Sequence, residues 1–409
     1  MTPASSSPLK LAPGLVVGIC FFIAALEGYD IQAFGVSAPH MAPELKLGPE
    51  QMGLAGSAAM LGLMLGALGG GWLADRVGRK PVLAASVLAF GLFSILTALA
   101  HNFETLTLAR LATGVGFGGA MPNLIAVATE ISPPEKRIAT TTSMFCGLPA
   151  GGAVVALLAR FGGETVDWRT LFFIGGALPI LLVPVILTLM PETRPEPDPS
   201  QDHNLARGLF GGGRIPATLL IWLIFGLDLL VTYLLLNWLP TLVIAKGFTA
   251  ADGATASLWQ NVASVVGALI LGRLSDRYGS RWLLIGVFAL LALAMAGLSA
   301  ATTMTAIAVY AAAAGFTVVG GLYVLYGVAP TYYPPQVRAL GVGAAIAVGR
   351  LGSIIGPLLA GDLKGMGYSA AQILMAMVPL VILTVVAIFA LGRIRPFAAP
   401  PAEGPAAGS

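Results

Sequence analysis

The stretch GLVVGICFFIAALEGYDIQAFGV, residues 14–36, is apolar except for two acidic residues near its centre, Glu27 and Asp30. It is long enough to cross a bilayer, because a spanning helix needs roughly 20 predominantly apolar residues. A carboxylate at that depth is costly, and ionisable side chains inside a membrane usually serve a function. The stretch therefore predicts a membrane span that carries a functional acidic pair.

The composition of the 409-residue chain agrees with a membrane setting. Hydrophobic residues make up 57% of it and charged residues 10%, with a mean hydropathy of +0.87, whereas soluble domains carry about 25% charged residues. The apolar runs are continuous, unlike the short alternating segments of membrane β-barrels. Helices are then the structure that satisfies the backbone in lipid. We therefore predict an all-α integral membrane protein.

Three other features of the sequence limit the class of protein. The net charge of +3 is too small to suggest binding to nucleic acid. The cysteines Cys20 and Cys146 both lie in apolar runs, so we interpret them as small buried hydrophobic residues rather than a disulfide or metal site. The first apolar run is too long for a cleavable signal peptide and lacks a small-residue cleavage site.

Twelve candidate spans follow one another with short connections, except between the sixth and the seventh. They lie near residues 14–37, 51–74, 81–100, 105–128, 138–160, 168–190, 214–239, 252–273, 281–300, 304–328, 338–360 and 369–391. Residues 191–213 are rich in Pro, Gly and polar residues and predict a cytoplasmic linker. We expect residues 1–190 to form one six-helix bundle, residues 214–396 a second one, and residues 397–409 a disordered tail.

The placement of Lys and Arg predicts the orientation, because cytoplasmic loops carry an excess of both. With the N-terminus in the cytoplasm, fifteen of these residues fall on the cytoplasmic side and five on the outer side. The five are Lys46, Arg160, Arg169, Lys246 and Lys364. The other two, Arg110 and Arg350, lie inside spans. The sequence thus favours cytoplasmic termini at both ends.

The two halves repeat each other at a constant offset of 201 residues. The residues that recur are Gly71, Leu73, Asp75, Arg76 and Gly78, as Gly272, Leu274, Asp276, Arg277 and Gly279, then Gly114 and Gly119, as Gly315 and Gly320, and Pro133, Pro134 and Arg137, as Pro334, Pro335 and Arg338. Glu27 falls opposite another acid, Asp228. A parallel repeat of two six-helix halves is typical of secondary transporters.

Several motifs carry a resemblance to a known family. GGGWLADRVGRK at 69–80 resembles the loop G-x-L-x-D-R-x-G-R-[RK] of the major facilitator superfamily, and Arg110-x-x-x-Gly114 resembles its fourth-helix motif. LEGYDIQ at 26–32 resembles the D-G-[YF]-D signature of aromatic acid:proton symporters, with Glu27 in place of the first Asp. Four segments are most similar to the 3-(3-hydroxyphenyl)propionate transporter group, namely LEGYDIQ, MPNLIAVATE at 121–130, YYPPQVRALGVG at 332–343 and VGRLGSIIGPLLAG at 348–361.

The resemblance implies a twelve-helix fold of two pseudo-symmetric bundles and alternating access. It implies import of an aromatic carboxylate, similar to hydroxyphenylpropionate or hydroxybenzoate, together with a proton. It also implies a monomer in a bacterial-type inner membrane, without a cofactor. The sequence agrees, since it contains no nucleophile–base set, metal cluster or cofactor fingerprint, and we expect no enzyme activity.

Glu27, Asp30 and Phe34 are spaced i, i+3, i+7 and share one face of the first span. We interpret the acids as proton sites on a water-filled path, and Asp30 as the better carrier because it matches the family position. The alternative is a static buried ion pair. Arg110 is expected either to pair with Asp30 and control its protonation or to fix the fourth span against the first. Asp228 completes the set of candidate proton-coupling residues.

Arg350 lies near the middle of the eleventh span. Its planar guanidinium matches a carboxylate through two parallel hydrogen bonds, so we expect it to hold the substrate carboxylate. The alternative is a structural partner for Asp228 or for helix carbonyls. Aromatic substrates also need flat apolar walls and a few hydrogen-bonding groups. The candidates for these are Phe34, Asn123, Tyr233, Asn237, Gln260, Asn261, Tyr323 and Tyr326.

A gate is predicted at the loop Asp75–Lys80 and its repeat. Gly71 and Gly78 permit close approach and tight turning, and Glu130 can pair with Arg79 or Arg137. We expect this cluster to latch the inner gate, and its repeat to latch more weakly because Ser280 replaces Arg79. The candidate gating residues are Gly71, Asp75, Arg76, Gly78, Arg79, Glu130, Arg137, Asp276 and Arg277.

Two other transport functions stay open at this point. One is a proton-coupled exporter of drugs or metabolites on the same fold, against which Arg350 argues. The other is a sugar-type symporter, suggested by PETR at 191–194, a motif that discriminates poorly.

Overall fold

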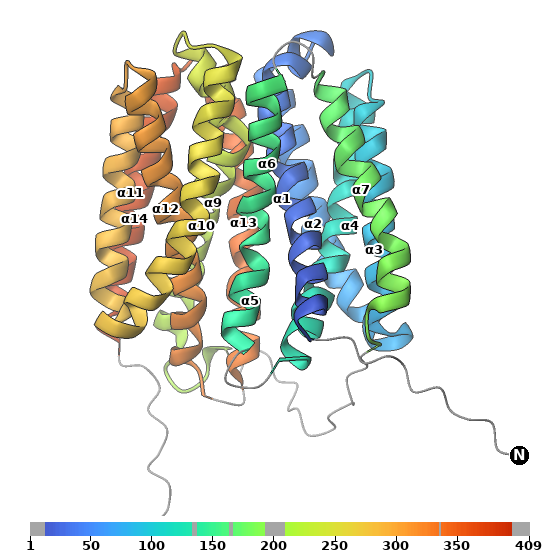
Figure 1. Cartoon of the computed structure of the whole chain (residues 1–409). Helices are drawn as coiled ribbons and strands as arrows, with labels where there is room; N and C mark the ends of the chain where they lie inside the picture. The colour runs from blue at the N-terminus through green and yellow to red at the C-terminus, as the bar shows by residue number, and fades with distance from the viewer. Residues whose placement is uncertain (1–12, 133–136, 163–166, 193–208, 335–336, 395–409) are drawn as a thin grey trace, which may run out of the picture.

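The computed structural model describes residues 13–132, 137–162, 167–192, 209–334 and 337–394, and these residues fold into helices joined by short turns (Figure 1). Twelve helical segments are long and apolar enough to cross a membrane. This agrees with the twelve spans and the all-α membrane fold predicted from the sequence. The predicted tail, residues 397–409, lies outside the described residues, and so do residues 193–208 of the predicted linker.

The described residues of the first half contain seven helices, of which α5 and α6 together make the fifth span. The bounds are α1 Pro13–Glu44, α2 Pro49–Val77, α3 Arg79–Ala98, α4 Phe103–Glu130, α5 Arg137–Phe145, α6 Gly147–Gly162 and α7 Trp168–Leu189. The division of the fifth span at Cys146 was not predicted. It coincides with Pro149, which cannot donate a backbone hydrogen bond to the carbonyl of Phe145, four residues earlier.

The second half follows the same order. Its bounds are α9 Ile215–Ala245, α10 Ala250–Tyr278, α11 Ser280–Ala300, α12 Met304–Val328, the 3-10 helix η3 Ala329–Tyr332, α13 Arg338–Gly365 and α14 Ala370–Leu391. Helices α1–α7 form one bundle and α9–α14 form the other, and the two lie side by side in Figure 1.

The sequence repeat is also a repeat of packing. Gly66 of α2 lies against the main-chain carbonyl of Val115 of α4, and Gly267 of α10 lies in the same way against Phe316 of α12. In both places a Cβ would collide with backbone, which explains why only glycine fits. The positions of each pair differ by the offset of 201 residues, so the two bundles share one helix-crossing geometry.

The two bundles meet toward one end of the molecule. We name this end, where α1 turns into α2, the Lys46 end, and the end where α2 turns into α3 the Gly78 end. Toward the Lys46 end, Ser57 Oγ of α2 donates a hydrogen bond to the Ile354 carbonyl of α13 at 2.6 Å. Gly53 of α2 lies close to the backbone of Pro357 and Gly361. Helices α1 and α9, and α6 and α10, also pack across the boundary.

Candidate transport site

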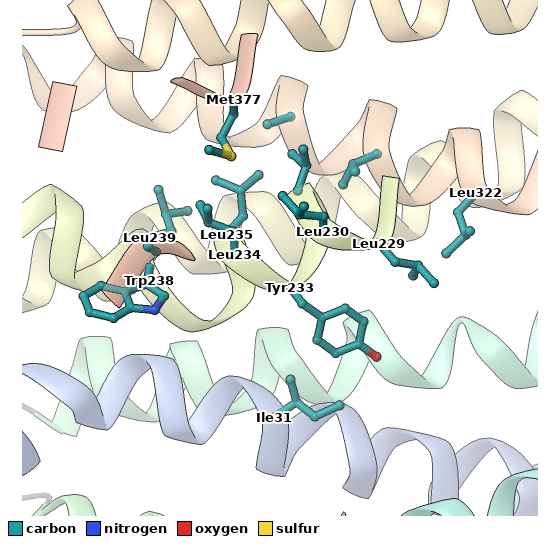
Figure 2. Packing of buried hydrophobic residues seen from close by; sticks show 14 of the residues in the cluster. Ile31, Leu229, Leu230, Tyr233, Leu234, Leu235, Trp238, Leu239, Leu322 and Met377 are labelled. Carbon is teal, nitrogen blue, oxygen red and sulfur yellow. The ribbon is translucent and has the colours of Figure 1, made fainter. Parts of the chain in front are cut away.

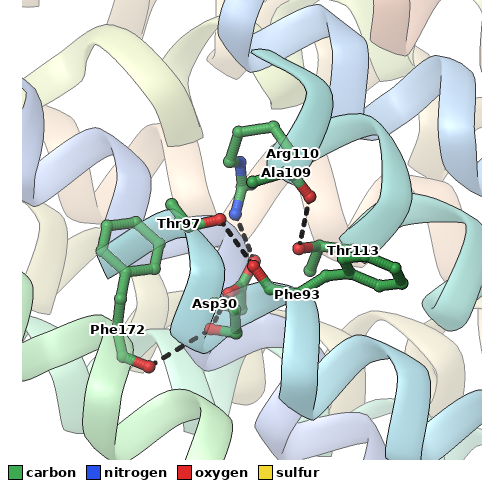
Figure 3. A network of polar contacts seen from close by, with 8 residues as sticks. Asp30, Phe93, Thr97, Ala109, Arg110, Thr113 and Phe172 are labelled. Carbon is green, nitrogen blue, oxygen red and sulfur yellow. Dashed lines mark hydrogen bonds and ion pairs between the residues drawn. The ribbon is translucent and has the colours of Figure 1, made fainter. Parts of the chain in front are cut away.

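A buried ion pair joins α1 to α4 inside the first bundle (Figure 3). Arg110 Nη1 lies 2.5 Å from Asp30 Oδ2, and the two side chains are 1% and 0% exposed. Ser94 Oγ of α3 donates a hydrogen bond of 2.8 Å to the other carboxylate oxygen, Oδ1. The guanidinium also lies 5.1 Å from the ring centroid of Phe34 and 5.8 Å from that of Phe172. Arg110 is therefore beside Asp30, one of the two predicted arrangements.

Loss of either partner of this ion pair is expected to lower the stability of the fold. Removing one partner of a buried ion pair leaves the other charge uncompensated, which typically costs about 3–5 kcal/mol. Ser94 was not identified from the sequence, because a serine in an apolar span carries no distinguishing signal. Arg110 Nε is buried without a hydrogen-bond partner among the described residues. The surroundings thus hold Arg110 mainly through Asp30 and two aromatic rings.

Arg350 of α13 forms the centre of a second polar cluster. Its Nη1 donates a hydrogen bond of 3.0 Å to the Tyr233 hydroxyl of α9. Figure 2 shows Tyr233 pointing from α9 toward Ile31 of α1, that is, toward the opposite bundle. Arg350 is half-buried. Its side chain thus lies where the two bundles face each other.

The acids at positions 27 and 228 have different surroundings. Glu27 of α1 is 2% exposed and interacts electrostatically with Arg350 and with Asp30. Asp228 of α9 is 1% exposed, and neither of its carboxyl oxygens has a hydrogen-bond partner among the described residues. Arg350 therefore does not hydrogen-bond to Asp228, the structural alternative considered from the sequence.

A group of aromatic rings adjoins the Arg350 cluster through Tyr326, which interacts electrostatically with Arg350. Tyr323 and Tyr326 of α12 have ring centroids 6.1 Å apart. Phe145 of α5 lies 6.4 Å from Tyr323 and 6.5 Å from Tyr326, and Phe225 of α9 lies 5.5 Å from Tyr326. Both tyrosines are half-buried. Phe145 was not predicted, because its role depends on α5 meeting α12 across the bundle boundary.

Two polar side chains, Asn261 and Gln32, connect the bundles. Asn261 Nδ2 of α10 donates a hydrogen bond of 2.8 Å to Gln32 Oε1 of α1. Gln32 Nε2 in turn donates one of 3.2 Å to the Leu236 carbonyl of α9. Gln260 lies beside Asn261 in sequence, and its side-chain oxygen is buried without a partner among the described residues. Asn261 thus joins the bundles, and Gln32 is a contact that sequence reasoning missed.

The remaining predicted substrate residues lie elsewhere. Asn123 donates its amide hydrogen bond to the Gly119 carbonyl in its own helix, at 2.8 Å. Asn237 likewise donates to the Tyr233 carbonyl at 2.8 Å. Phe34 and Asn237 both lie against Gly56 of α2. These two therefore belong to the boundary toward the Lys46 end.

The predicted gate contains an ion pair between Arg79 and Glu130. It joins α3 to α4 of the same bundle, so the pair by itself does not hold the two bundles together. The Arg79 backbone N–H donates a hydrogen bond of 2.9 Å to Glu192 Oε1. Gly78 has φ +103° and its repeat Gly279 has φ +84°, which fits the tight turns expected there.

The other gating residues differ in what the structure places around them. Arg76 stacks over the Trp72 ring at 3.7 Å, and Arg277 lies 5.3 Å from that of Tyr278. The expectation of close approach at Gly71 is wrong, because a Cβ there would meet open space. Its neighbour Gly70 faces α4 instead, since successive helical residues point about 100° apart. The side chains of Asp75, Arg137 and Asp276 lie outside the described parts of the chain.

Sequence comparisons place this architecture in a family. The model of the Major Facilitator Superfamily matches residues 20–262 and 221–408. The 3-(3-hydroxy-phenyl)propionate transporter of Escherichia coli (strain K12) is 40% identical and the match covers 97% of this chain and 98% of that protein. The 4-hydroxybenzoate transporter PcaK of Pseudomonas aeruginosa is 33% identical, with 91% of each covered. The gallate transporter of Pseudomonas putida is 32% identical, over 88% and 87%.

The fold also matches a solved structure. A bacterial homolog to the human lysosomal transporter Spinster, in an inward-facing and unoccupied conformation, has a TM-score of 0.76 at 19% identity, covering 94% of this chain and 98% of that one. At this identity the match shows the fold alone. The family model and the relatives identify a transporter and not an enzyme: the chain belongs to the Major Facilitator Superfamily, within its family of aromatic acid transporters.

Proposed function

We propose that this protein imports an aromatic carboxylate, similar to hydroxyphenylpropionate or hydroxybenzoate, together with a proton by alternating access. The observation that carries the proposal is the position of Arg350. A half-buried guanidinium faces the bundle boundary, next to the Tyr233 hydroxyl. It interacts electrostatically with Tyr326, whose ring lies beside that of Tyr323. Such a cluster combines a carboxylate partner with flat aromatic walls.

Glu27 supplies the coupling between anion and proton. Its carboxyl interacts electrostatically with the same guanidinium that we assign to the substrate. Two carboxylates beside one Arg repel each other. Binding of the substrate anion therefore favours the protonated form of Glu27, and release of the anion favours loss of that proton.

Asp30, Arg110 and Asp228 complete the proposed proton path. Asp30 can accept a proton when movement of α4 against α1 separates it from Arg110. Asp228 has no hydrogen-bond partner for either oxygen among the described residues, and burying an unpaired charge is costly. We therefore assign Asp228 the neutral form in this conformation.

The charge balance of the cycle determines which gradient drives it. A monoanion that moves with one proton carries no net charge, so the membrane potential contributes nothing. Each additional proton would add about 2.3 kcal/mol per 100 mV. One-to-one coupling therefore predicts uptake that follows the pH gradient alone.

Alternating access fits the way the bundles meet. We propose that the Gly78 end, with its excess of Lys and Arg in the sequence, faces the cytoplasm, as do both termini. The contacts of Ser57 with Ile354 and of Asn261 with Gln32 then close the outer side. The bundle boundaries proposed here remain residues 1–190 and 214–396, with the linker at 191–213.

Uptake of radiolabelled 3-(3-hydroxyphenyl)propionate and 4-hydroxybenzoate into oriented membrane vesicles tests the proposal. An inward-directed pH gradient should drive accumulation, while a membrane potential imposed at equal pH should not. Accumulation with voltage alone would contradict one-to-one coupling. Net efflux under the inward gradient would instead support an exporter.

A further inference from the structure

A cavity of about 110 Å³ lies between the bundles at the Lys46 end. It is separate from the Arg350 cluster and is lined from four helices and one turn. The lining residues used below are Phe34, Met52, Asn237, Trp238, Thr241 and Lys364. In the orientation proposed above, this cavity opens toward the outer side. Its position is where a substrate would arrive first.

The deep part of the cavity is suited to an aromatic ring. Phe34, Met52 and Trp238 are all at most 5% exposed and make its apolar wall. The indole N–H of Trp238 donates a hydrogen bond of 3.1 Å to the Pro357 carbonyl, which fixes the ring. Figure 2 shows the Trp238 ring on α9. Apolar cavities of about 150 Å³ bind benzene. This cavity is smaller, at about 110 Å³, but it is open on one side, so we infer that a single ring enters it while its substituent stays at the opening.

The rim provides polar groups suited to a carboxylate. Lys364 is half-buried and lines the cavity, and no carboxylate of the described residues lies within 4.0 Å of its ammonium. Thr241 Oγ1 is buried without a hydrogen-bond partner among those residues. A free ammonium and an unsatisfied hydroxyl beside an apolar wall match an anionic head group on an aromatic ring.

Phe34 forms the floor that separates this cavity from the buried ion pair. It lines the cavity, while its ring centroid lies 5.1 Å from the Arg110 guanidinium. Gly56 leaves room for both Phe34 and Asn237 at the same place. Phe34 and Asn237, two of the residues predicted to touch substrate, are thus brought together here and not beside Arg350.

We propose that this cavity is a second, outer binding site for the aromatic carboxylate, with Lys364 and Thr241 at its head group and Phe34, Met52 and Trp238 around its ring. The inference rests on the proposed substrate class. An anion held here while the outer side is closed enters the central site when the bundles separate. The protein accordingly binds two substrate molecules in this conformation.

Calorimetric titration of the full-length protein in lipid nanodiscs with 3-(3-hydroxyphenyl)propionate tests this. The wild type should bind two molecules. Lys364→Gln should weaken one site about five- to tenfold, Lys364→Arg should preserve it, and Thr241→Val should weaken it about threefold. Lys46→Gln is the matched control, because it removes a lysine from the same end that does not line the cavity. The neutral amide of the same acid should bind the outer site at least fivefold more weakly.

Arg350→Ala separates this inference from the proposed function. It should remove the central site and leave a Lys364-dependent site whose occupancy changes the fluorescence of Trp238, with Trp238→Phe as the blank. Binding of one molecule in the wild type, lost in Arg350→Ala and unchanged in Lys364→Gln, would overturn the outer site alone. Absence of any binding to the wild type would overturn the substrate class and the outer site together.

Discussion

Arg350 Nη1 donates a hydrogen bond of 3.0 Å to the Tyr233 hydroxyl, which ties α13 to α9 in the wall that faces the first bundle. Because a guanidinium has five N–H donors, this contact fixes the side chain and still leaves donors for a carboxylate. Among the described residues no acid forms an ion pair with Arg350 within 4.0 Å. Arg350 is thus a positioned cation whose remaining N–H groups can bind a carboxylate.

Replacement of Arg350 should distinguish charge from geometry. Arg350→Ala is expected to weaken substrate binding at the central site about a hundredfold, because the charged hydrogen bonds to a carboxylate are lost. Arg350→Lys should lose about tenfold, since the charge stays but the paired donors do not. Equilibrium binding of labelled substrate to purified protein measures both. Equal affinity in the three proteins would exclude Arg350 as the carboxylate partner.

Asp30→Asn should abolish proton-driven accumulation and preserve exchange of labelled for unlabelled substrate. The variant should also lose thermal stability, because Arg110 is left as an unpaired buried charge at a cost of about 3–5 kcal/mol. Asp30→Asn/Arg110→Gln should recover most of that stability, yet not the accumulation. Melting curves and vesicle uptake check the two effects separately. Full accumulation in Asp30→Asn would remove Asp30 from the coupling path.

Tyr326 provides a test of the aromatic wall. Tyr326→Phe keeps the ring beside Tyr323 and Phe225, so preference for aromatic over alicyclic carboxylates should change less than twofold. Tyr326→Leu should reduce that preference about three- to tenfold, since an aromatic pair contributes about 0.5–1.5 kcal/mol beyond burial. Competition between benzoate and cyclohexanecarboxylate for uptake measures it. An unchanged preference in Tyr326→Leu would show that the ring does not touch substrate.

The close crossing at Gly53 should control which side is open. A Cβ there would lie 2.8 Å from the Pro357 carbonyl oxygen and 3.2 Å from Gly361 Cα, so Gly53→Ala disfavours contact of α2 with α13. Overpacking of this kind typically costs about 1–3 kcal/mol. The fraction of molecules open at the Lys46 end should rise accordingly. Electron spin resonance distances between spin labels on the two bundles measure this fraction. Gly69→Ala, where a Cβ meets open space, should leave the distances unchanged.

Much of the fold was predictable because membrane spans have a strong local signal. Continuous apolar runs identified twelve spans, and the offset of 201 residues related the two halves before any contact was known. The pairing of Arg110 with Asp30 was also one of two expectations, because few charged residues lie inside the spans and few partners are therefore available.

The contacts that sequence reasoning missed depend on how helices rotate and meet. Gln32, Ser94 and Phe145 are ordinary residues in apolar spans, and only the packing of α1, α3 and α5 against other helices gives them partners. Phe34 and Asn237 were predicted to touch substrate from their side-chain type and helical spacing, and the structure turns both toward the cavity at the Lys46 end. Gly70, not Gly71, faces α4 for the same reason of phase.

Proton movement with substrate is the most direct test of the account. Proteoliposomes with a trapped pH indicator are given 3-(3-hydroxyphenyl)propionate with no initial pH gradient and with the membrane potential held at zero. We predict that the interior acidifies by one proton per substrate molecule taken up, and that Glu27→Gln lowers this ratio. Substrate uptake without any acidification would contradict symport.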